Sequence, residues 1–315
     1  MTAALALVAQ LLHGALVLAA APVVTGLLAL FAARLQGRVG PHVLQPWRDL
    51  RRLFRKQSMR AENVSWLFGA APAAAFAATA AAAMLVPSFT LGMTTAPAAD
   101  LLVIAGLLLG ARAVVALAAM DTGSAFGGIG ASRLMVASVL AEPALLVVFL
   151  AVALLAGGTN LDAAAAPLRE GGVRLALGLA LPALLAIALA ETGGMPDGAA
   201  NAELAMADAA ATVEYSGGAL ALLQATAQLR LLVWLSLIAV LVAPFGITPA
   251  GASPGLWVVG LAAWTAKIFI LIAALALFHT VLARMRLARV PAFLGVALLL
   301  AMLAAALALA GQAAA

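Results

Sequence analysis

The sequence predicts an all-α integral membrane protein of about eight transmembrane helices, with an amphipathic helix at the membrane surface in its first cytoplasmic loop. Two observations indicate this fold class. Hydrophobic residues make up 66% of the chain, whereas soluble domains contain about 45–50%. Mean hydropathy is +1.16 and only 9% of the residues are charged. Such a chain has too little polar surface to cover itself in water, so the bilayer must be its solvent.

Eight stretches are apolar enough to cross a bilayer, which takes about 20 residues of helix. In chain order, the expected spans are 4–32, 66–87, 101–120, 134–156, 173–190, 219–243, 256–279 and 290–311. The first is too long for a cleaved signal peptide, so we expect it to be retained. Strand-like alternation and internal repeats are both absent from the sequence, which argues against a barrel or an inverted-repeat transporter. Residues 1–315 therefore form one membrane domain.

The basic residues lie mostly on one side of these spans. Thirteen of the 17 Lys and Arg residues fall there: Arg34, Arg38, Arg48, Arg51, Arg52, Arg55, Lys56, Arg60, Arg112, Arg133, Arg284, Arg286 and Arg289. Arg112 and Arg133 are counted as flanking a Gly-rich cytoplasmic loop at 121–133. The positive-inside rule places these loops in the cytoplasm and both termini outside, as in a bacterial inner membrane. Topology thus explains the basic charge, and we expect no nucleic-acid partner.

The sequence contains no cysteine and three scattered histidines. Disulfides, iron–sulfur clusters and thiolate metal sites within this chain are therefore excluded, and we expect no metal or cofactor in it.

The first inner loop, 34–62, opens with Gly and Pro residues and then becomes amphipathic. Val43, Leu44, Trp47, Leu50, Leu53 and Phe54 recur at helical spacing, while Arg48, Arg51, Arg52 and Arg55 occupy the other face. This pattern predicts an interfacial helix. It is either a basic anchor on anionic lipid or a platform for a soluble partner.

The segment 190–217 holds five of the 12 acids and no base. We expect "AELAMADAAATVEYSG" to be helical, with Glu203 and Glu214 on one face and Asp208 turned away. Crowded, poorly hydrated carboxylates repel one another's charge, which favours proton uptake in coupled steps. The alternative is a plain solvated acidic loop.

Three ionisable residues inside the expected spans are candidates for a functional role. Glu142 is followed by Pro143, and a carboxyl in hydrocarbon is either a proton-relay group or a structural acid held by a nearby donor. Arg230 and Lys267 are intramembrane bases. Lys267 is a candidate partner for an acid on another helix, with snorkelling as the alternative for both bases.

"RLQGRVGP…LQPWRDLRRLFRK" resembles the first cytoplasmic loop of the family containing the complex I membrane subunit NuoH (ND1) and its counterpart in group 4 [NiFe] hydrogenases of the formate hydrogenlyase and hydrogenase-4 types. The residues that carry the match are Arg38, Gly40, Pro41, Gln45, Pro46 and Asp49. The likeness continues at 121–146, 190–217 and 264–295, and "DTGSAFGG" is more similar to the hydrogenase branch.

The resemblance implies a non-catalytic membrane subunit of an oxidoreductase complex. Its partners would be a hydrogenase-like large subunit and an iron–sulfur small subunit, which carry the [NiFe] and iron–sulfur groups, and antiporter-like membrane subunits. It implies that Glu142, Glu191, Glu203 and Glu214 form a path for proton transfer, to which we add Asp208. The candidate docking residues are Arg38, Arg48, Asp49, Arg51, Arg52, Arg55, Asp121 and Arg133.

The sequence departs from the family near Glu191. Gly193 and Gly194 stand where the complex I branch has an Arg, the stretch from Pro196 to Glu203 is about two residues shorter, and Asp208-Ala209 replaces a His-Glu pair. Three alternatives stay open: a subunit lining a quinone chamber, a stand-alone transporter and a purely structural anchor.

Overall fold

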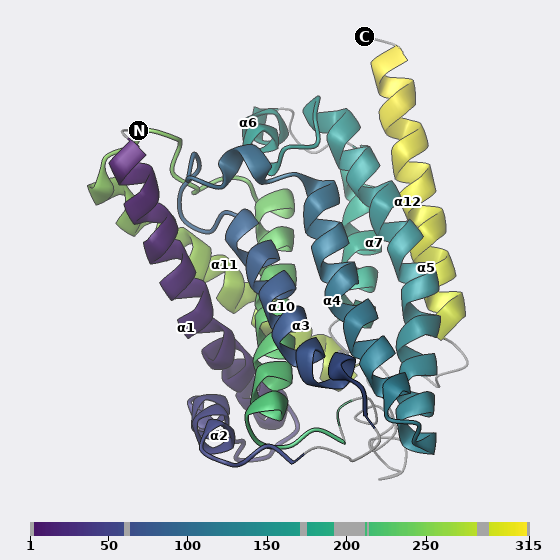
Figure 1. Ribbon diagram of the computed structural model, residues 1–315. Coiled ribbons are helices and arrows are strands. Elements are labelled where there is room, and N and C mark those ends of the chain that lie inside the picture. Colours follow the sequence, from purple (N-terminus) through teal and green to yellow (C-terminus); the bar gives the residue numbers. More distant parts are fainter. Residues whose placement is uncertain are drawn as a thin grey trace.

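The computed structural model describes residues 3–59, 64–170, 175–191, 212, 214–281 and 290–313. Within these ranges the chain is all-α apart from two isolated β-bridges, which confirms the predicted class (Figure 1). Seven helices of this part are long and apolar enough to cross a membrane, and α7 is a shorter apolar helix of 17 residues. These eight helices match the eight expected spans in order.

The elements run as follows: α1 Ala3–Leu35, α2 Gln45–Phe54, α3 Trp66–Leu85, a short 3-10 helix Ala96–Ala98, α4 Leu101–Asp121, α5 Ala125–Ala156, α6 Leu161–Glu170, α7 Leu175–Glu191, α10 Gly217–Val242, α11 Pro254–Val281 and α12 Val290–Ala313.

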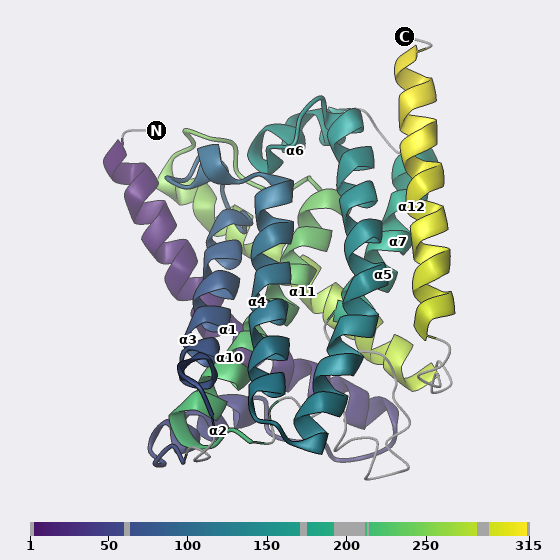
Figure 2. The same cartoon turned by 45° about the vertical axis from the view of Figure 1, so that its right-hand side comes forward.

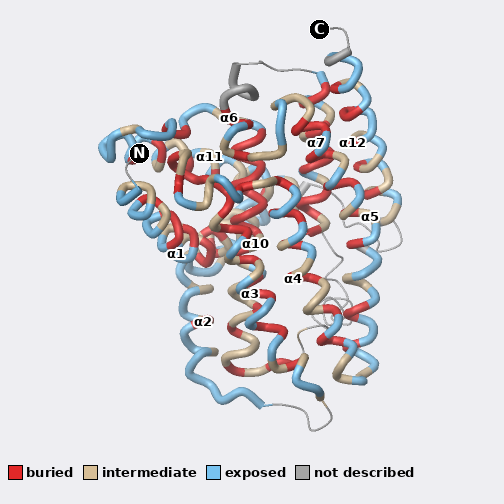
Figure 3. Tube along the Cα trace, turned by 45° about the horizontal axis from the view of Figure 1, so that its top comes forward, coloured by how far each residue is buried: buried red, intermediate tan, exposed pale blue. Residues whose placement is uncertain are grey.

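Helix α10 forms the centre of the bundle. It contacts α1, α2, α3, α7 and α11, whereas α12 packs on α5 and α7, and α4 lies between α3 and α5 (Figures 1 and 2). Every residue from Leu231 to Leu241 is buried, so this stretch of α10 appears red in Figure 3. The polar side chains of α10, such as Gln228, Arg230 and Ser236, are thereby kept from lipid, where polar groups are costly.

Both termini lie at the end of the bundle opposite α2 (Figure 1). At that terminal end, loops from three parts of the chain are joined by backbone pairing. Leu91 N–H donates to Thr248 O at 2.9 Å, and Leu161 N–H donates to Ala99 O at 2.7 Å. These bonds satisfy backbone groups of the loops that connect the spans.

The predicted amphipathic helix is present as α2. Leu50 is buried against the bundle, while Arg48, Arg51, Arg52 and Arg55 are exposed. Two contacts fasten this region to α1. Trp47 Nε1 donates to Ala19 O at 3.2 Å, and a Cβ on Gly26 would lie 1.9 Å from Val43 O. Gly26 therefore permits the close approach of the loop that precedes α2.

The chain after α2 is clamped to the start of α10. Gly218 N–H donates to Ser58 Oγ at 3.1 Å, and Met59 N–H donates to Ser216 Oγ at 2.7 Å. Gly217 has φ +56, and a Cβ there would lie 2.6 Å from Gln57 O. Glycine meets both demands, because it tolerates positive φ and leaves room for the neighbouring backbone. The first loop and the end of the acidic segment thus form one surface.

The structure differs from the sequence prediction in two elements. The segment 121–133 is helical from Ala125 onward, because Ser124 Oγ accepts from Gly127 N–H and caps the new helix. Only the turn at Thr122–Ser124 remains a loop. Helix α6 was not predicted, since its 10 residues are too few to register as a membrane span. It is anchored by Asp162, whose Oδ2 accepts from Gly92 N–H at 2.6 Å.

Replacing Gly26 with Val should loosen α2. The added atoms collide with the backbone at Val43, and overpacking of this kind costs about 1–3 kcal/mol. We expect a lower thermal midpoint of the purified protein and faster trypsin cleavage among the arginines of α2. Gly110→Ala is the control, because nothing lies within 4 Å of a Cβ at Gly110. Equal cleavage rates for Gly26→Val and the control would contradict this account.

Tyr215 should remain neutral in strong alkali. Its ring stacks on Phe68 with centroids 4.0 Å apart, and its hydroxyl donates to Phe68 O at 3.0 Å. Burial, and then the charge of Asp121, raise the pKa of Tyr215 to about 12. The stability that this ring contributes is therefore complete below pH about 10, the usual tyrosine pKa, and is lost as pH rises through the folded value.

Because the chain contains one tyrosine, tyrosinate absorbance of the purified protein measures this titration directly. In denaturant the same ring should titrate near pH 10. A midpoint near 10 in the folded protein would show that Tyr215 is not buried as described.

Candidate functional site

Arg112 lies inside the bundle and not beside a loop. It occupies the second half of α4 and is 6% exposed. The prediction that Arg112 flanks the cytoplasmic loop is wrong, because α4 continues to Asp121. Its position within the span 101–120 was a usable signal, since an intramembrane base is a functional candidate by default.

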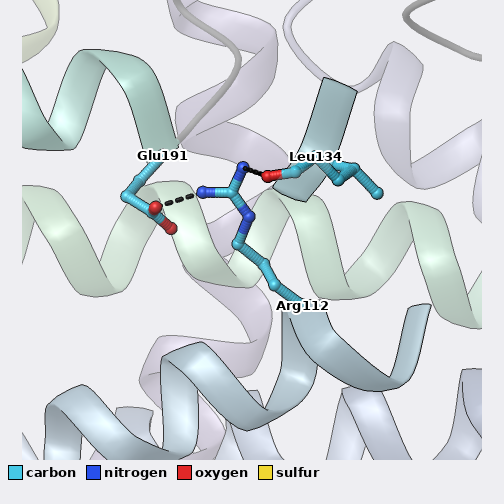
Figure 4. Close-up of polar contacts among 3 residues, drawn as sticks. All are labelled: Arg112, Leu134 and Glu191. Atoms are coloured by element: carbon cyan, nitrogen blue, oxygen red, sulfur yellow. Dashed lines mark hydrogen bonds and ion pairs between the residues drawn. The ribbon is translucent and has the colours of Figure 1, made fainter. Parts of the chain in front are cut away.

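The side chain of Arg112 joins three helices (Figure 4). Its Nη1 forms an ion pair with Oε1 of Glu191, the last residue of α7, and its Nη2 donates to Leu134 O of α5 at 3.4 Å. Glu191 is 9% exposed. Both charges are thus withdrawn from water, and each depends on the other, because removing one partner of a buried pair costs about 3–5 kcal/mol.

Glu142 lies next to this pair. It is half-buried on α5, shares a hydrogen bond with Ser138 one turn earlier, and interacts electrostatically with Glu191 and Arg112. Leu134, Ser138 and Glu142 are spaced by four residues and therefore follow one face of α5. The contact of Arg112 with Leu134 consequently lies on the same face as Glu142.

Arg230 of α10 completes the group, because its charge interacts with those of Arg112 and Glu191. We call Arg112, Glu142, Glu191 and Arg230 the charged cluster. Each residue comes from a different helix, and together they carry two positive and two negative formal charges. Charges inside a bilayer require such partners.

Glu191 has a positive partner although the sequence after it departs from the family pattern. The sequence supplies Gly193 and Gly194 where an Arg was expected. In the structure, the positive partner of Glu191 comes from α4. No local pattern around residue 191 could have indicated a base 79 residues away.

Lys267 has a different role. Its Nζ donates to the carbonyls of Ala243, at 2.6 Å, and Phe245, and lies 5.1 Å from the Phe245 ring centroid. These carbonyls follow the C-terminus of α10, where a positive charge is favourable. In the described part of the chain, the ion pairs of Lys267 with an acid that the sequence suggested are not formed.

The acidic segment is described only at its edges. Glu191 ends α7, as predicted, and Glu214 lies in a turn just before α10. Glu203 and Asp208 lie outside the described residues, so their predicted relation to Glu214 stays a prediction.

Some of the docking candidates are exposed, and others have partners within the chain. Arg38, Arg48, Arg51, Arg52 and Arg55 are exposed, while Arg133 is half-buried.

Two acids among the docking candidates have partners within the chain. Asp49 pairs with Arg52 at 3.3 Å and accepts from Gln45 Nε2 at 3.2 Å. Asp121 Oδ2 accepts from both N–H and Oγ of Ser65 at 2.8 Å, which fixes the start of α3. Asp121 therefore has a structural role on this surface.

Comparison with known proteins identifies the family. Residues 7–310 match the family model described as NADH dehydrogenase. Hydrogenase-4 component C of Escherichia coli (strain K12) is 34% identical over 226 residues, which cover 71% of each chain. Formate hydrogenlyase subunit 4 of the same organism is 31% identical over 280 residues, covering 88% of this chain and 90% of that protein.

The fold has a counterpart among solved structures. A chain of the membrane-bound sulfane sulfur reductase, an archaeal respiratory membrane complex, superposes with a TM-score of 0.78 at 20% identity, covering 95% of this chain and 99% of that one. The match over nearly the whole sequence confirms the resemblance given by the first loop. The protein belongs to the NADH dehydrogenase (NuoH/ND1-like) family of membrane subunits, with relatives in hydrogenase-4 and formate hydrogenlyase.

Proposed function

We propose that this protein anchors a peripheral redox module at the membrane and couples its turnover to the movement of protons, or sodium ions, in a complex of the group 4 hydrogenase type. The observation that carries the proposal is the charged cluster with its buried Arg112–Glu191 ion pair, which lies where the acidic segment leaves the bundle at Glu191. The relatives in hydrogenase-4 and formate hydrogenlyase support this type of complex. The chain itself would not be catalytic.

The proposed docking surface is the exposed face of α2. Its arginines project away from a helix that Trp47 and the Ser58–Gly218 bond hold against the bundle. A platform must be rigid to transmit force from the module to the bundle, and these contacts hold α2 rigidly in place. The partners we propose are a hydrogenase-like large subunit and an iron–sulfur small subunit on this side, with antiporter-like subunits alongside in the membrane. This side would face the cytoplasm of a bacterium, with both termini outside.

The proposed ion path begins in the segment 190–217 and enters the bundle at Glu191. From there, Arg112 connects Glu191 to the face of α5 that carries Glu142. Carboxyl groups held near opposite charges in a dry setting respond to a change of charge nearby, because electrostatic interactions are strong where water is excluded. A redox event in the attached module would supply that change.

A lipophilic ligand such as a quinone is the second candidate function. A cavity of about 210 Å³ lies between α7, α10 and α11, and its lining is apolar, including Leu189, Trp234 and Phe278. Leu189 is two residues from Glu191, so a bound molecule would lie near the charged cluster. In the variant Leu189→Cys, an alkylating reagent would label the introduced cysteine. Slower labelling when quinone is added would favour this function.

Glu142→Gln should uncouple the complex. The amide keeps the size of the side chain but cannot exchange a proton, and loss of a positioned acid–base group lowers the rate of its step by ~10²–10⁴. We expect the redox turnover to continue while ion translocation in vesicles falls at least ~10-fold. Glu203→Gln should do the same.

Asp162→Asn is the matched control, because its amide oxygen can still accept from Gly92 N–H at the terminal end of the bundle. If Glu142→Gln prevents assembly, Glu142 is structural. If the variant assembles and translocates normally, the proposed ion path is wrong.

The triple variant Arg51→Gln, Arg52→Gln, Arg55→Gln should release the redox module. Exposed charges attract a partner over about 8 Å at physiological ionic strength, so their loss weakens docking. Membranes washed in moderate salt should lose the soluble subunits, as read by immunoblot. The corresponding triple Lys variant keeps the charge and should retain them. Full retention by the Gln variant would exclude α2 as the platform.

A further inference from the structure

The cavity of about 210 Å³ between α7, α10 and α11 reaches the central helix of the bundle. Both α7 and α11 pack against α10. Leu231, Trp234, Leu235 and Ile238 line the cavity from α10, and they follow one face of that helix at spacings of three and four residues. All four are buried. We call these four residues the floor of the cavity.

The rim of the cavity is exposed. Leu185 of α7 and Ala274 of α11 both line the cavity, yet Leu185 is 43% exposed and Ala274 is exposed as well. Both residues lie more than one helical turn inside their helices. Because these helices cross the bilayer, the mouth between the two residues faces hydrocarbon and neither of the aqueous surfaces.

The lining of the cavity is apolar. Its side chains are aliphatic or aromatic, and the indole N–H of Trp234 is the one polar side-chain group among them. Trp234 Nε1 is buried and has no acceptor among the described residues. A buried water requires two to four polar partners, whereas an apolar cavity of about 150 Å³ stays dry and binds benzene. This cavity is therefore suited to hydrocarbon and not to water.

The molecules that reach the mouth are those of the bilayer itself. Acyl chains surround the bundle at this depth, and one that bends into the cavity gains dispersion contacts that an empty space cannot provide. Such a chain has no polar atoms, so it gives up no hydrogen bond on entering. The mouth is already present, so entry does not require the helices to separate.

A quinone ring matches this lining less well than an acyl chain does. The ring carries two carbonyl groups, and the lining offers one side-chain donor, at Trp234. The backbone N–H groups of the three helices are bonded within those helices. At least one carbonyl of a buried ring would therefore lack a donor, which is unfavourable away from water.

We propose that the cavity between α7, α10 and α11 is a binding site for one acyl chain of a membrane phospholipid, which enters between Leu185 and Ala274 and packs on the floor formed by α10. The site does not depend on the proposed ion path. It excludes the quinone considered above from the same space.

The test uses the purified protein, with the subunits that accompany it, in phosphatidylethanolamine vesicles whose acyl chains carry a photoreactive diazirine. Illumination attaches the chain to neighbouring side chains, which mass spectrometry then maps. Trp234 and Leu235 should be labelled although both are buried. Leu237 is also buried on α10 but does not line the cavity, so it should stay unlabelled. Ile270 is 65% exposed and reports ordinary contact with the bilayer.

Three variants sharpen the test. Ala274→Phe places a ring at the mouth, so labelling of Leu235 should fall to background while Ile270 stays labelled. Ala266→Phe is the matched control, because Ala266 is exposed on the same helix but does not line the cavity, and labelling should persist. Trp234→Phe keeps an aromatic ring and removes the N–H, so labelling of Leu235 should be unchanged.

Three results would overturn the proposal. An unlabelled floor in the wild type, with Ile270 labelled, would show that no acyl chain enters. Undiminished labelling of Leu235 in Ala274→Phe would show that the chain does not enter at this rim. Loss of floor labelling when a water-soluble ubiquinone is added, but not in Trp234→Phe, would assign the cavity to quinone. Ion translocation by Glu142→Gln is measured separately, so the acyl-chain site and the ion path can fail independently.

Discussion

A guanidinium and a carboxylate held inside a bundle of membrane helices constrain everything around them. Neither Arg112 nor Glu191 can return to water without breaking the ion pair that ties α4 to α7, two helices that each pack against α5. The charges of Glu142 and Arg230 interact with this pair. A buried pair of this kind adds little net stability compared with apolar packing. Its presence in an otherwise apolar bundle is therefore better explained by function than by folding.

Most of this architecture can be predicted from the sequence, because the bilayer constrains which segments can cross it. Spans must be apolar and about 20 residues long because backbone groups need internal partners in hydrocarbon, and all eight expected spans correspond to helices. The amphipathic pattern around Trp47 and Leu50 likewise predicts α2, since its spacing follows from helical geometry alone. Glu142 and Glu191 could be assigned to their spans for the same reason.

Contacts between distant parts of the chain were not predictable in this way. The pairing of Arg112 with Glu191 depends on how α4 and α7 are each placed against α5, which no periodicity encodes. The sequence alone suggests that Asp121 is a surface acid. In the structure, Asp121 Oδ2 accepts from Ser65 N–H and so fixes the start of α3. The Gly-rich stretch after it reads as a loop because glycine weakens helices, but Ser124 caps it and α4 packs against it. Tertiary packing overrides local propensity at these places.

The clamp between the first loop and the start of α10 bears on how the protein is made. Ser58 and Met59 bond to residues that follow them by about 160 positions. A ribosome adds about 5–20 residues each second, so the early segment waits many seconds before its anchor emerges. During that interval the loop is held to the growing bundle through α1 and α2 only. The surface at the α2 end of the bundle is thus completed late in synthesis, after five of the eight long apolar segments have been translated.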